Sequence, residues 1–247
     1  MLVPARHVEI QVLCDGRGWV LTLGERECSI QRRHQKLIEE TPSSALTPEL
    51  REAMEAAAER ACRAVGYVNA GTFEFLLGPD ATFSFIELNA RLQVEHPVTE
   101  LCTGIDLVRA QLQVAAGEPL AACGRAPRRG HAIEVRVNAE DADRDFLPAP
   151  GTVTTFRPPL GPGVRVDTFV EDGATIPPYY DSLLAKLVVW DADRPAAIAR
   201  ADRALEELRV EGVPPTRELA LAVLRSPEFR SGAYSTSTLA GLQAVAA

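Results

Sequence analysis

The sequence predicts an α+β fold, in which helices pack against a mainly antiparallel sheet. Apolar runs on either side of short Gly- or Pro-containing turns predict hairpins near residues 16 and 79. A capped helix pattern begins at Thr47, and strand and helix patterns follow one another through the second half without an internal repeat. The 247 residues suffice for one or two domains with substantial cores.

The first predicted elements are a hairpin and a helix. Strands at 7–14 and 19–23 flank an Asp-Gly-Arg-Gly turn. The helix begins after Thr47, has proline at its first position, runs to Val65 and ends at Gly66. Its buried stripe is predicted to contain Leu50, Met54, Ala57, Ala61 and Val65.

A second hairpin follows, with a turn at 78–80. Its second strand is predicted to continue to Glu95, where Pro97 breaks it, and a helix is expected from 105 to 116. The segment 123–130 is the best internal boundary, so the predicted domains are 1–122 and 130–238. Beyond it we expect strands at 131–138, 152–156, 164–170 and 183–190, then helices at 195–208 and 217–224.

An alternating polar pattern is the strongest indication of a site. In an extended strand, alternate side chains point to the same face. A solvated sheet face also alternates, but it usually carries Lys, Thr and Ser, so two carboxylates, two carboxamides and a guanidinium favour a site. The polar residues are Glu87, Asn89, Arg91, Gln93 and Glu95.

If the loop of this hairpin has four residues, Glu74 lies opposite or nearly opposite Glu87. Two carboxylates about 4 Å apart repel by on the order of 4 kcal/mol near a protein surface, so a shared proton, an arginine or a divalent cation must offset the repulsion. Oxygen ligands from Glu74, Glu87 and Asn89, with few His or Cys nearby, favour Mg²⁺ or Mn²⁺. Mg²⁺ usually completes its shell with water and phosphate oxygens, which indicates a nucleotide.

A basic segment at 30–36 points to an anionic ligand. It carries three fixed positive charges in a chain of net charge −8. A nucleic-acid patch or a solvated face would also be basic, but the acidic balance and the lack of interleaved aromatics argue against nucleic acid. Beside the carboxylate strand, phosphate or bicarbonate binding becomes the better interpretation.

Composition narrows the setting of the protein. The N-terminus lacks an apolar run of signal-peptide length, and no stretch approaches 18 apolar residues. The five cysteines are scattered without CxxC spacing, so reduced thiols are expected. We therefore expect a cytoplasmic protein, and the negative charge argues against binding nucleic acid or a membrane surface.

These motifs together resemble the C-terminal half of a biotin carboxylase, the ATP-grasp subunit or domain of acetyl-, propionyl- and related acyl-CoA carboxylases. The resemblance implies the C-terminal portion of an ATP-grasp domain over 1–122, with the metal and bicarbonate site, and a biotin carboxylase C-terminal domain over 130–238. It is carried by residues 6–12, 25–36, 71–75, 85–100, 130–141, 146–151 and 178–187.

The resemblance also implies roles for individual residues. Mg²⁺ (or Mn²⁺) would be held by Glu74, Glu87 and Asn89. Bicarbonate would be bound by Lys36, Arg91, Gln93 and the backbone of Val94. ATP would be contacted by His7, Gln31, His34, Glu74 and Glu87. The residues implied in catalysis are Arg91, Glu95 as general base, and Arg136, which would meet the ureido oxygen of biotin.

Plainer interpretations stand beside some of these roles. Arg136 can be a surface charge on the strand at 131–138, and Glu95 can be the salt-bridge partner of Arg91. Five further residues are expected to be structural: His96, His131, Tyr179, Tyr180 and Asp181.

The implied function is ATP- and bicarbonate-dependent carboxylation of biotin on a carrier, the first half-reaction of an acyl-CoA carboxylase. The implied partners are a biotin carboxyl carrier domain or protein, a carboxyltransferase subunit, and a second copy in a homodimer. The family's first α/β domain and lid, with its Gly-rich phosphate loop, find no match here, so an N-terminal half is also expected as a partner and the chain alone is expected to be inactive. The alternative is an inactive truncated remnant or interaction module that keeps the fold.

Overall fold

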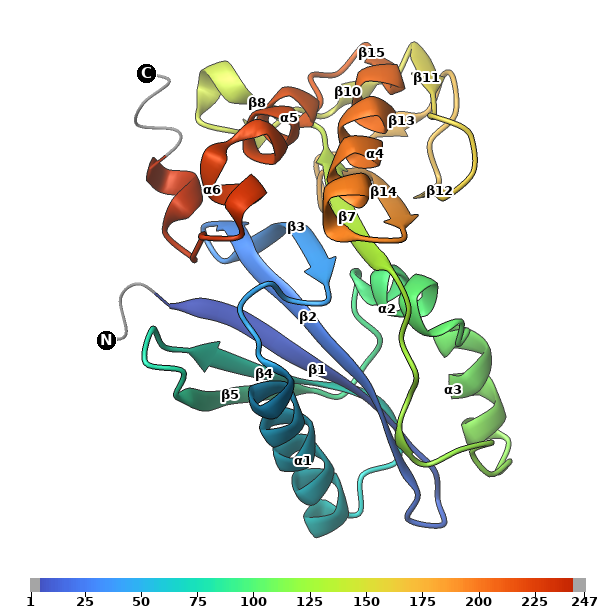
Figure 1. The fold of residues 1–247 in the computed structure, drawn as a ribbon. Helices are drawn as coiled ribbons and strands as arrows, with labels where there is room; N and C mark the ends of the chain where they lie inside the picture. Colours follow the sequence, from blue (N-terminus) through green and yellow to red (C-terminus); the bar gives the residue numbers. More distant parts are fainter. Residues whose placement is uncertain (1–4, 242–247) are drawn as a thin grey trace.

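The structure, a computed structural model, describes residues 5–241. A nine-stranded sheet runs through both halves of this part of the chain (Figure 1). Neighbours along its main path are antiparallel, while β6 (Gly124–Arg125) lies parallel to β2, so the predicted α+β class is confirmed. In spatial order the path is β12 (Val164–Thr168), β14 (Leu183–Asp191), β7 (His131–Asn138), β3 (Gln35–Thr41), β2 (Val20–Arg32), β1 (Arg6–Cys14), β4 (Asn69–Leu77) and β5 (Phe83–Asn89).

The first hairpin is confirmed, and its turn follows from Asp15. The Oδ1 atom of Asp15 accepts hydrogen bonds from the backbone N–H groups of Arg17 and Trp19, at 2.9 and 3.0 Å. The strand β2 extends to Arg32, well beyond the predicted end at residue 23. A tight turn then has positive φ at Arg33 (50°) and His34 (66°), and β3, which was not predicted, returns alongside β2.

The helix α1 (Pro48–Val65) has the predicted ends. Thr47 caps it by accepting a hydrogen bond from the N–H of Leu50, and Gly66 ends it with φ of 62°. The predicted stripe is wrong at its C-terminal end, because Val65 is 69% exposed. The buried positions continue from Met54 in four-residue steps through Ala58 and Cys62. The predicted stripe stepped three residues from Met54 to Ala57, so its later positions lie on a side of the helix turned away from the sheet.

The second hairpin depends on a bulge. Leu77 pairs with Phe83, so the turn is 78–82, and Phe75 pairs with Phe85. A register shift at Ile86 then brings Glu87 directly opposite Glu74. Without the extra residue, Glu87 would point to the other face of the sheet.

The predicted continuation of this strand to Glu95 is wrong. The strand β5 ends at Asn89, and α2 (His96–Thr103), which was not predicted, begins seven residues later. Pro97 lies in the first turn of this helix, where its missing N–H breaks no helical hydrogen bond, and so it starts a helix rather than ending a strand. The expected helix at 105–116 is α3 (Leu107–Ala115).

The second half is built around β7 and β14. The helices α4 (Arg194–Glu207) and α5 (Arg217–Arg225) match the predictions, and α6 (Pro227–Ser231) follows them. The expected strand at 152–156 is divided between two small sheets. Short strands and a turn of 3₁₀ helix complete this half: β8 (Glu140–Asp141), η1 (Ala142–Arg144), β9 (Leu147–Pro148), β10 (Gly151–Thr152), β11 (Thr155–Arg157), β13 (Thr175–Ile176) and β15 (Arg209–Glu211).

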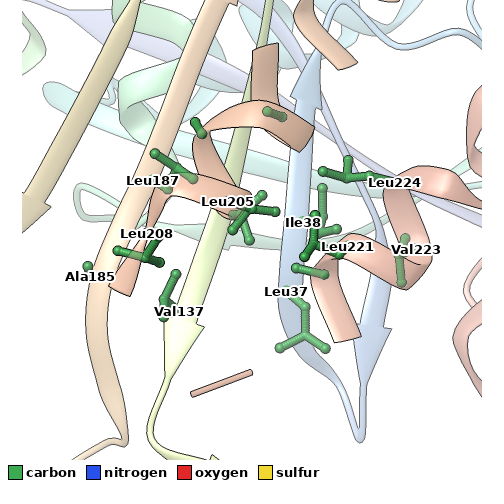
Figure 2. Packing of buried hydrophobic residues seen from close by; sticks show 14 of the residues in the cluster. Leu37, Ile38, Val137, Ala185, Leu187, Leu205, Leu208, Leu221, Val223 and Leu224 are labelled. Atoms are coloured by element: carbon green, nitrogen blue, oxygen red, sulfur yellow. The ribbon is translucent and has the colours of Figure 1, made fainter. Parts of the chain in front are cut away.

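Helices cover both faces of β7 and β14. On one face, Leu205 and Leu221 from α4 and α5 pack with Val137, Leu187 and Ile38 of the sheet (Figure 2). On the other face, α2 packs against these strands through Val98 and Cys102, which contact Ala132 and Val188. The sheet is continuous from β3 to β7 across the expected boundary at 123–130, so the division into 1–122 and 130–238 stays a prediction. Within residues 5–241, none of the helices combines the length and apolar character needed to cross a membrane.

Candidate active site

The predicted site residues gather around one polar cavity of about 340 Å³. Strands β1, β3, β4, β5 and β7 and the segment before α2 form its walls. Gln31 is the predicted residue that does not line it; its Nε2 lies 3.5 Å from Nδ1 of His7. The predicted residues that do line it are His7, His34, Lys36, Glu74, Glu87, Asn89, Arg91, Gln93, Val94, Glu95 and Arg136.

Lys36 is the central cation of this cavity. Its Nζ lies 2.5 Å from Glu9, 3.0 Å from Glu74 and 2.7 Å from Glu95. Burial alone would lower the pKa of Lys36, but Glu9 and the other carboxylates raise it well above its usual range. Burial alone would raise the pKa of Glu9, yet Arg26 and Lys36 lower it to about 2. Lys36 therefore serves as the counter-ion of the carboxylates around it, and both it and Glu9 remain charged.

The expected metal ligands meet at the edge of the cavity. Glu74 and Glu87 are cross-strand neighbours, and the amide of Asn89 donates to an oxygen of each, at 3.0 and 3.1 Å. Burial opposes the charge on Glu74, but the hydrogen bond from His7 and the charge of Lys36 lower its pKa far below the usual range. Glu87 is exposed, so its carboxylate is accessible from the cavity. Two carboxylates and a carboxamide are oxygen ligands of the kind that Mg²⁺ and Mn²⁺ accept, and this set fits either ion.

A buried arginine orients Gln93 within the site. Arg26 is fully buried and donates to Glu9 and, through Nη2 at 3.1 Å, to Oε1 of Gln93. This contact leaves Nε2 of Gln93 to donate to Glu74 at 2.9 Å. Arg26 also bonds Gln11, Thr72 and Thr99. Sequence reasoning missed Arg26 and Glu9, although both lie inside segments that carried the family resemblance.

Glu95 lies between two cations, and neither is Arg91. Its Oε1 is 2.7 Å from Lys36, and its Oε2 accepts a hydrogen bond from Nη2 of Arg136 at 2.9 Å. Arg91 is exposed, and its Nη2 donates to Oδ1 of Asn89 at 3.3 Å instead. The suggested salt bridge between Glu95 and Arg91 is therefore wrong. The chain turns after β5, which separates the two side chains.

Arg136 is not a free surface charge. Its Nε donates to Glu39 at 2.7 Å, and burial of the guanidinium is offset by Glu39 and Glu95, which raise its pKa. These pairings use Nε and Nη2, so Nη1 takes part in neither of them, and Arg136 lines the cavity.

The residues expected to be structural divide into two groups. His131 pairs with Glu40 at 2.7 Å, and His96 bonds the carbonyl of Gln93 at 2.8 Å, as structural residues do. Asp181 lines the cavity with Ser182. The tyrosines before it do not pack into the core: Tyr179 and Tyr180 are 86% and 81% exposed.

Two family models match the sequence. The one described as carbamoyl-phosphate synthase L chain, ATP binding domain, matches residues 1–123. The one described as biotin carboxylase C-terminal domain matches residues 134–241.

Curated relatives are similar over most of the chain. A biotin carboxylase of Nostoc sp. is 52% identical over 94% of this chain and 52% of its own length. Biotin carboxylase 1 of Bacillus subtilis is 49% identical over 95% of this chain and 52% of its own length. The chain thus spans about half the length of the curated relatives it matches.

Solved structures show the same fold. The biotin carboxylase domain dimer of Hydrogenobacter thermophilus 2-oxoglutarate carboxylase, in complex with MgADP, ADP and bicarbonate, has a TM-score of 0.95 at 43% identity, covering 98% of this chain and 53% of that one. A biotin carboxylase complex from Campylobacter jejuni has a TM-score of 0.94 at 44% identity, covering 98% and 54%.

Proposed function

The chain belongs to the biotin carboxylase family, and on this premise we propose that it forms the half of a biotin carboxylase that binds bicarbonate, the phosphates of ATP with their metal ion, and biotin. One observation carries the proposal: Lys36 and Arg136 flank the carboxylate of Glu95 within a single polar cavity. A base between two cations suits a reaction whose substrates and intermediates are anions.

The first step is the activation of bicarbonate. This small planar anion needs positive and polar groups that converge on it, a role for Lys36, Arg91, Gln93 and the backbone of Val94. Glu95 accepts the proton of bicarbonate, and the freed oxygen attacks the γ-phosphorus of ATP, so that carboxyphosphate and ADP form. His7, Gln31 and His34 contact the nucleotide. The lining of one cavity by Lys36, Gln93 and Glu95 supports this assignment.

Glu74, Glu87 and Asn89 would hold Mg²⁺ or Mn²⁺ at the cavity edge. When bound there, such an ion neutralises charge on the phosphates, as phosphoryl transfer requires. The hydrogen bonds from His7 and Gln93 keep Glu74 oriented toward Asn89.

The second step is the carboxylation of biotin. Biotin becomes a nucleophile when its ureido nitrogen loses a proton, and the charge then spreads onto the ureido oxygen. Arg136 stabilises that oxygen through Nη1, the atom outside its pairings with Glu39 and Glu95. The nitrogen attacks the carboxyl carbon of carboxyphosphate, and the phosphate that leaves takes up the proton that the ureido nitrogen loses.

The proposed partners follow from the family. They are a biotin carboxyl carrier domain or protein, a carboxyltransferase subunit and, in a homodimer, a second copy of the complete enzyme; the setting is cytoplasmic. The alternative of an inactive remnant or interaction module is not favoured, because all of the predicted polar site residues except Gln31 line the cavity.

The test is reconstitution with the N-terminal half of a relative such as the Nostoc biotin carboxylase. The assembled pair is expected to hydrolyse ATP only when bicarbonate is present and to carboxylate free biotin. Arg33→Met serves as a control, because Arg33 is exposed and lies outside the cavity lining. An assembled pair that cleaves ATP equally with and without bicarbonate would contradict the proposal.

A further inference from the structure

Two buried glutamates are cross-strand neighbours within the sheet. Glu39 of β3 is directly opposite Glu134 of β7, and both are 0% exposed. Directly opposed residues have Cβ atoms roughly 5 Å apart and point to the same face. By alternation along β7, Glu134 shares its face with Ala132 and Arg136, the face that α2 covers.

Most of their oxygens lack hydrogen-bond donors. Within residues 5–241, neither oxygen of Glu134 has a partner, and neither does Oε2 of Glu39. The other oxygen of Glu39 accepts from Arg136. A buried carboxylate without a partner is costly, and two carboxylates cannot hydrogen-bond each other unless one of them carries a proton.

The two nearby lysines pair with groups other than Glu39 and Glu134. On β14, Lys186 pairs with Asp167 at 3.3 Å and donates to the carbonyl of Val94 at 3.2 Å. On β3, Lys36 pairs with Glu9, Glu74 and Glu95.

The other neighbours add little positive charge. Directly opposite Glu134 on β14 lies Val188, and α2 contributes Val98 and Cys102 on this face. Burial, and then the charge of Glu39, raise the pKa of Glu134 well above its usual range, although Lys186 and Arg136 act in the opposite direction. Burial likewise raises the pKa of Glu39.

We propose that Glu134 is a positioning residue: as a neutral carboxylic acid, it donates a hydrogen bond to Oε2 of Glu39 and so holds Glu39 against Arg136. Glu39 then fixes Nε of Arg136 and turns the rest of the guanidinium toward Glu95 and the cavity. The effect on biotin carboxylation rests on the proposed function, whereas the proton on Glu134 and the ordering of Arg136 do not.

The proton is tested in the 247-residue chain with Glu134→Gln, which keeps the shape and the neutral donor. Above the ordinary carboxyl pKa, the native state holds a proton that the unfolded state has lost, so the unfolding equilibrium constant rises by up to about tenfold per pH unit. Infrared spectra of the wild type at pH 7 should show a carboxylic acid C=O band. Glu134→Gln should remove this band and flatten the pH dependence. Absence of the band from the wild type, or an unchanged pH slope in the variant, would overturn the proposal.

The positioning role is tested by comparing Glu134→Gln with Glu134→Leu, which fills space but donates no hydrogen bond. NMR should find slow exchange of the Arg136 Nε–H in the wild type and in Glu134→Gln, and exchange faster by about tenfold or more in Glu134→Leu. Equal exchange rates in the wild type, Glu134→Gln and Glu134→Leu would overturn the positioning role. If Glu134→Leu does not fold, fast exchange of the Arg136 Nε–H in Glu134→Gln would overturn it instead. In the reconstituted enzyme, Glu134→Leu should lower kcat for biotin carboxylation while Glu134→Gln retains it. Absence of turnover in every form would count against the proposed function alone, because the infrared and exchange results do not depend on it.

Discussion

Replacing Lys36 with methionine would remove the cation that three carboxylates share. The flexible methionine chain fills the space of the lysine stem, but Glu9, Glu74 and Glu95 then lose a partner within 3.0 Å. Glu9 is fully buried, so it cannot turn to solvent for compensation. We expect the loss to appear as a large decrease in the free energy of unfolding.

The magnitude follows from Glu9. Its pKa is lowered from 4.5 to about 2 by Arg26 and Lys36, acting against burial. Since one pKa unit corresponds to about 1.4 kcal/mol, the two cations contribute on the order of 3 kcal/mol net through Glu9. Lys36 supplies only part of that, but it also pairs with Glu74 and Glu95, and breaking a buried pair typically costs about 3–5 kcal/mol. Lys36→Met should therefore lower the free energy of unfolding by about 3 kcal/mol at pH 7.

The pH dependence has a definite sign. Because the native pKa values of Glu9 and Glu74 are depressed, their stabilisation is present above the ordinary carboxyl pKa and is lost as the pH falls through the native values. Without Lys36 these pKa values rise, so the carboxylates of the variant take up protons near pH 4 and repel one another less. The difference in the free energy of unfolding between wild type and variant should therefore be smaller at pH 4 than at pH 7.

Urea unfolding at pH 7 and pH 4 measures both effects. Arg33→Met is the matched control, because Arg33 pairs with Asp145 on the surface and its removal should cost less than about 1 kcal/mol. A loss below about 1 kcal/mol for Lys36→Met at pH 7, or an equal gap at both pH values, would refute the reasoning.

The remaining predictions concern the metal site, the core and a histidine. Glu87→Gln should weaken Mn²⁺ binding about tenfold or more in titration calorimetry, whereas Glu59→Gln on the exposed side of α1 should not. Leu205→Ala should cost about 2–5 kcal/mol in urea unfolding, because Leu205 is 0% exposed, while Val65→Ala at an exposed position should change stability by less than about 0.5 kcal/mol. Burial lowers the pKa of His96, so NMR should find its titration midpoint below the ordinary value of 6.5.

Local chemistry made much of this protein predictable. The Asp15 turn, the Thr47 cap and the Gly66 end are encoded by neighbouring residues, and all three formed as predicted. The family implied by the sequence motifs is confirmed by the relatives. Cross-strand proximity of Glu74 and Glu87 also follows from short-range pairing, although it needed the bulge at Ile86, which alternation alone does not reveal.

Long-range burial explains what the sequence did not show. Arg26 and Glu39 are charged residues of the kind usually found on the solvated face of a strand. Both are nevertheless 0% exposed, because the sheet and α2 enclose them. Gln93 reaches the site through the turn between β5 and α2 rather than from a continuous strand. Tertiary contacts of this kind depend on residues more than 60 positions apart, such as Arg26 and Gln93.

The most direct test of the account compares Glu95→Gln with Arg136→Ala in the reconstituted enzyme, with ATP cleavage and biotin carboxylation measured separately. Glu95→Gln removes the base of the first step, so both rates should fall, by about 10²- to 10⁴-fold. Arg136→Ala acts after carboxyphosphate forms, so biotin carboxylation should fall far more than bicarbonate-dependent ATP cleavage. If Arg136→Ala instead lowered ATP cleavage as much as biotin carboxylation, so that the remaining cleavage stayed fully coupled to carboxylation, the assignment of Arg136 to biotin would be contradicted.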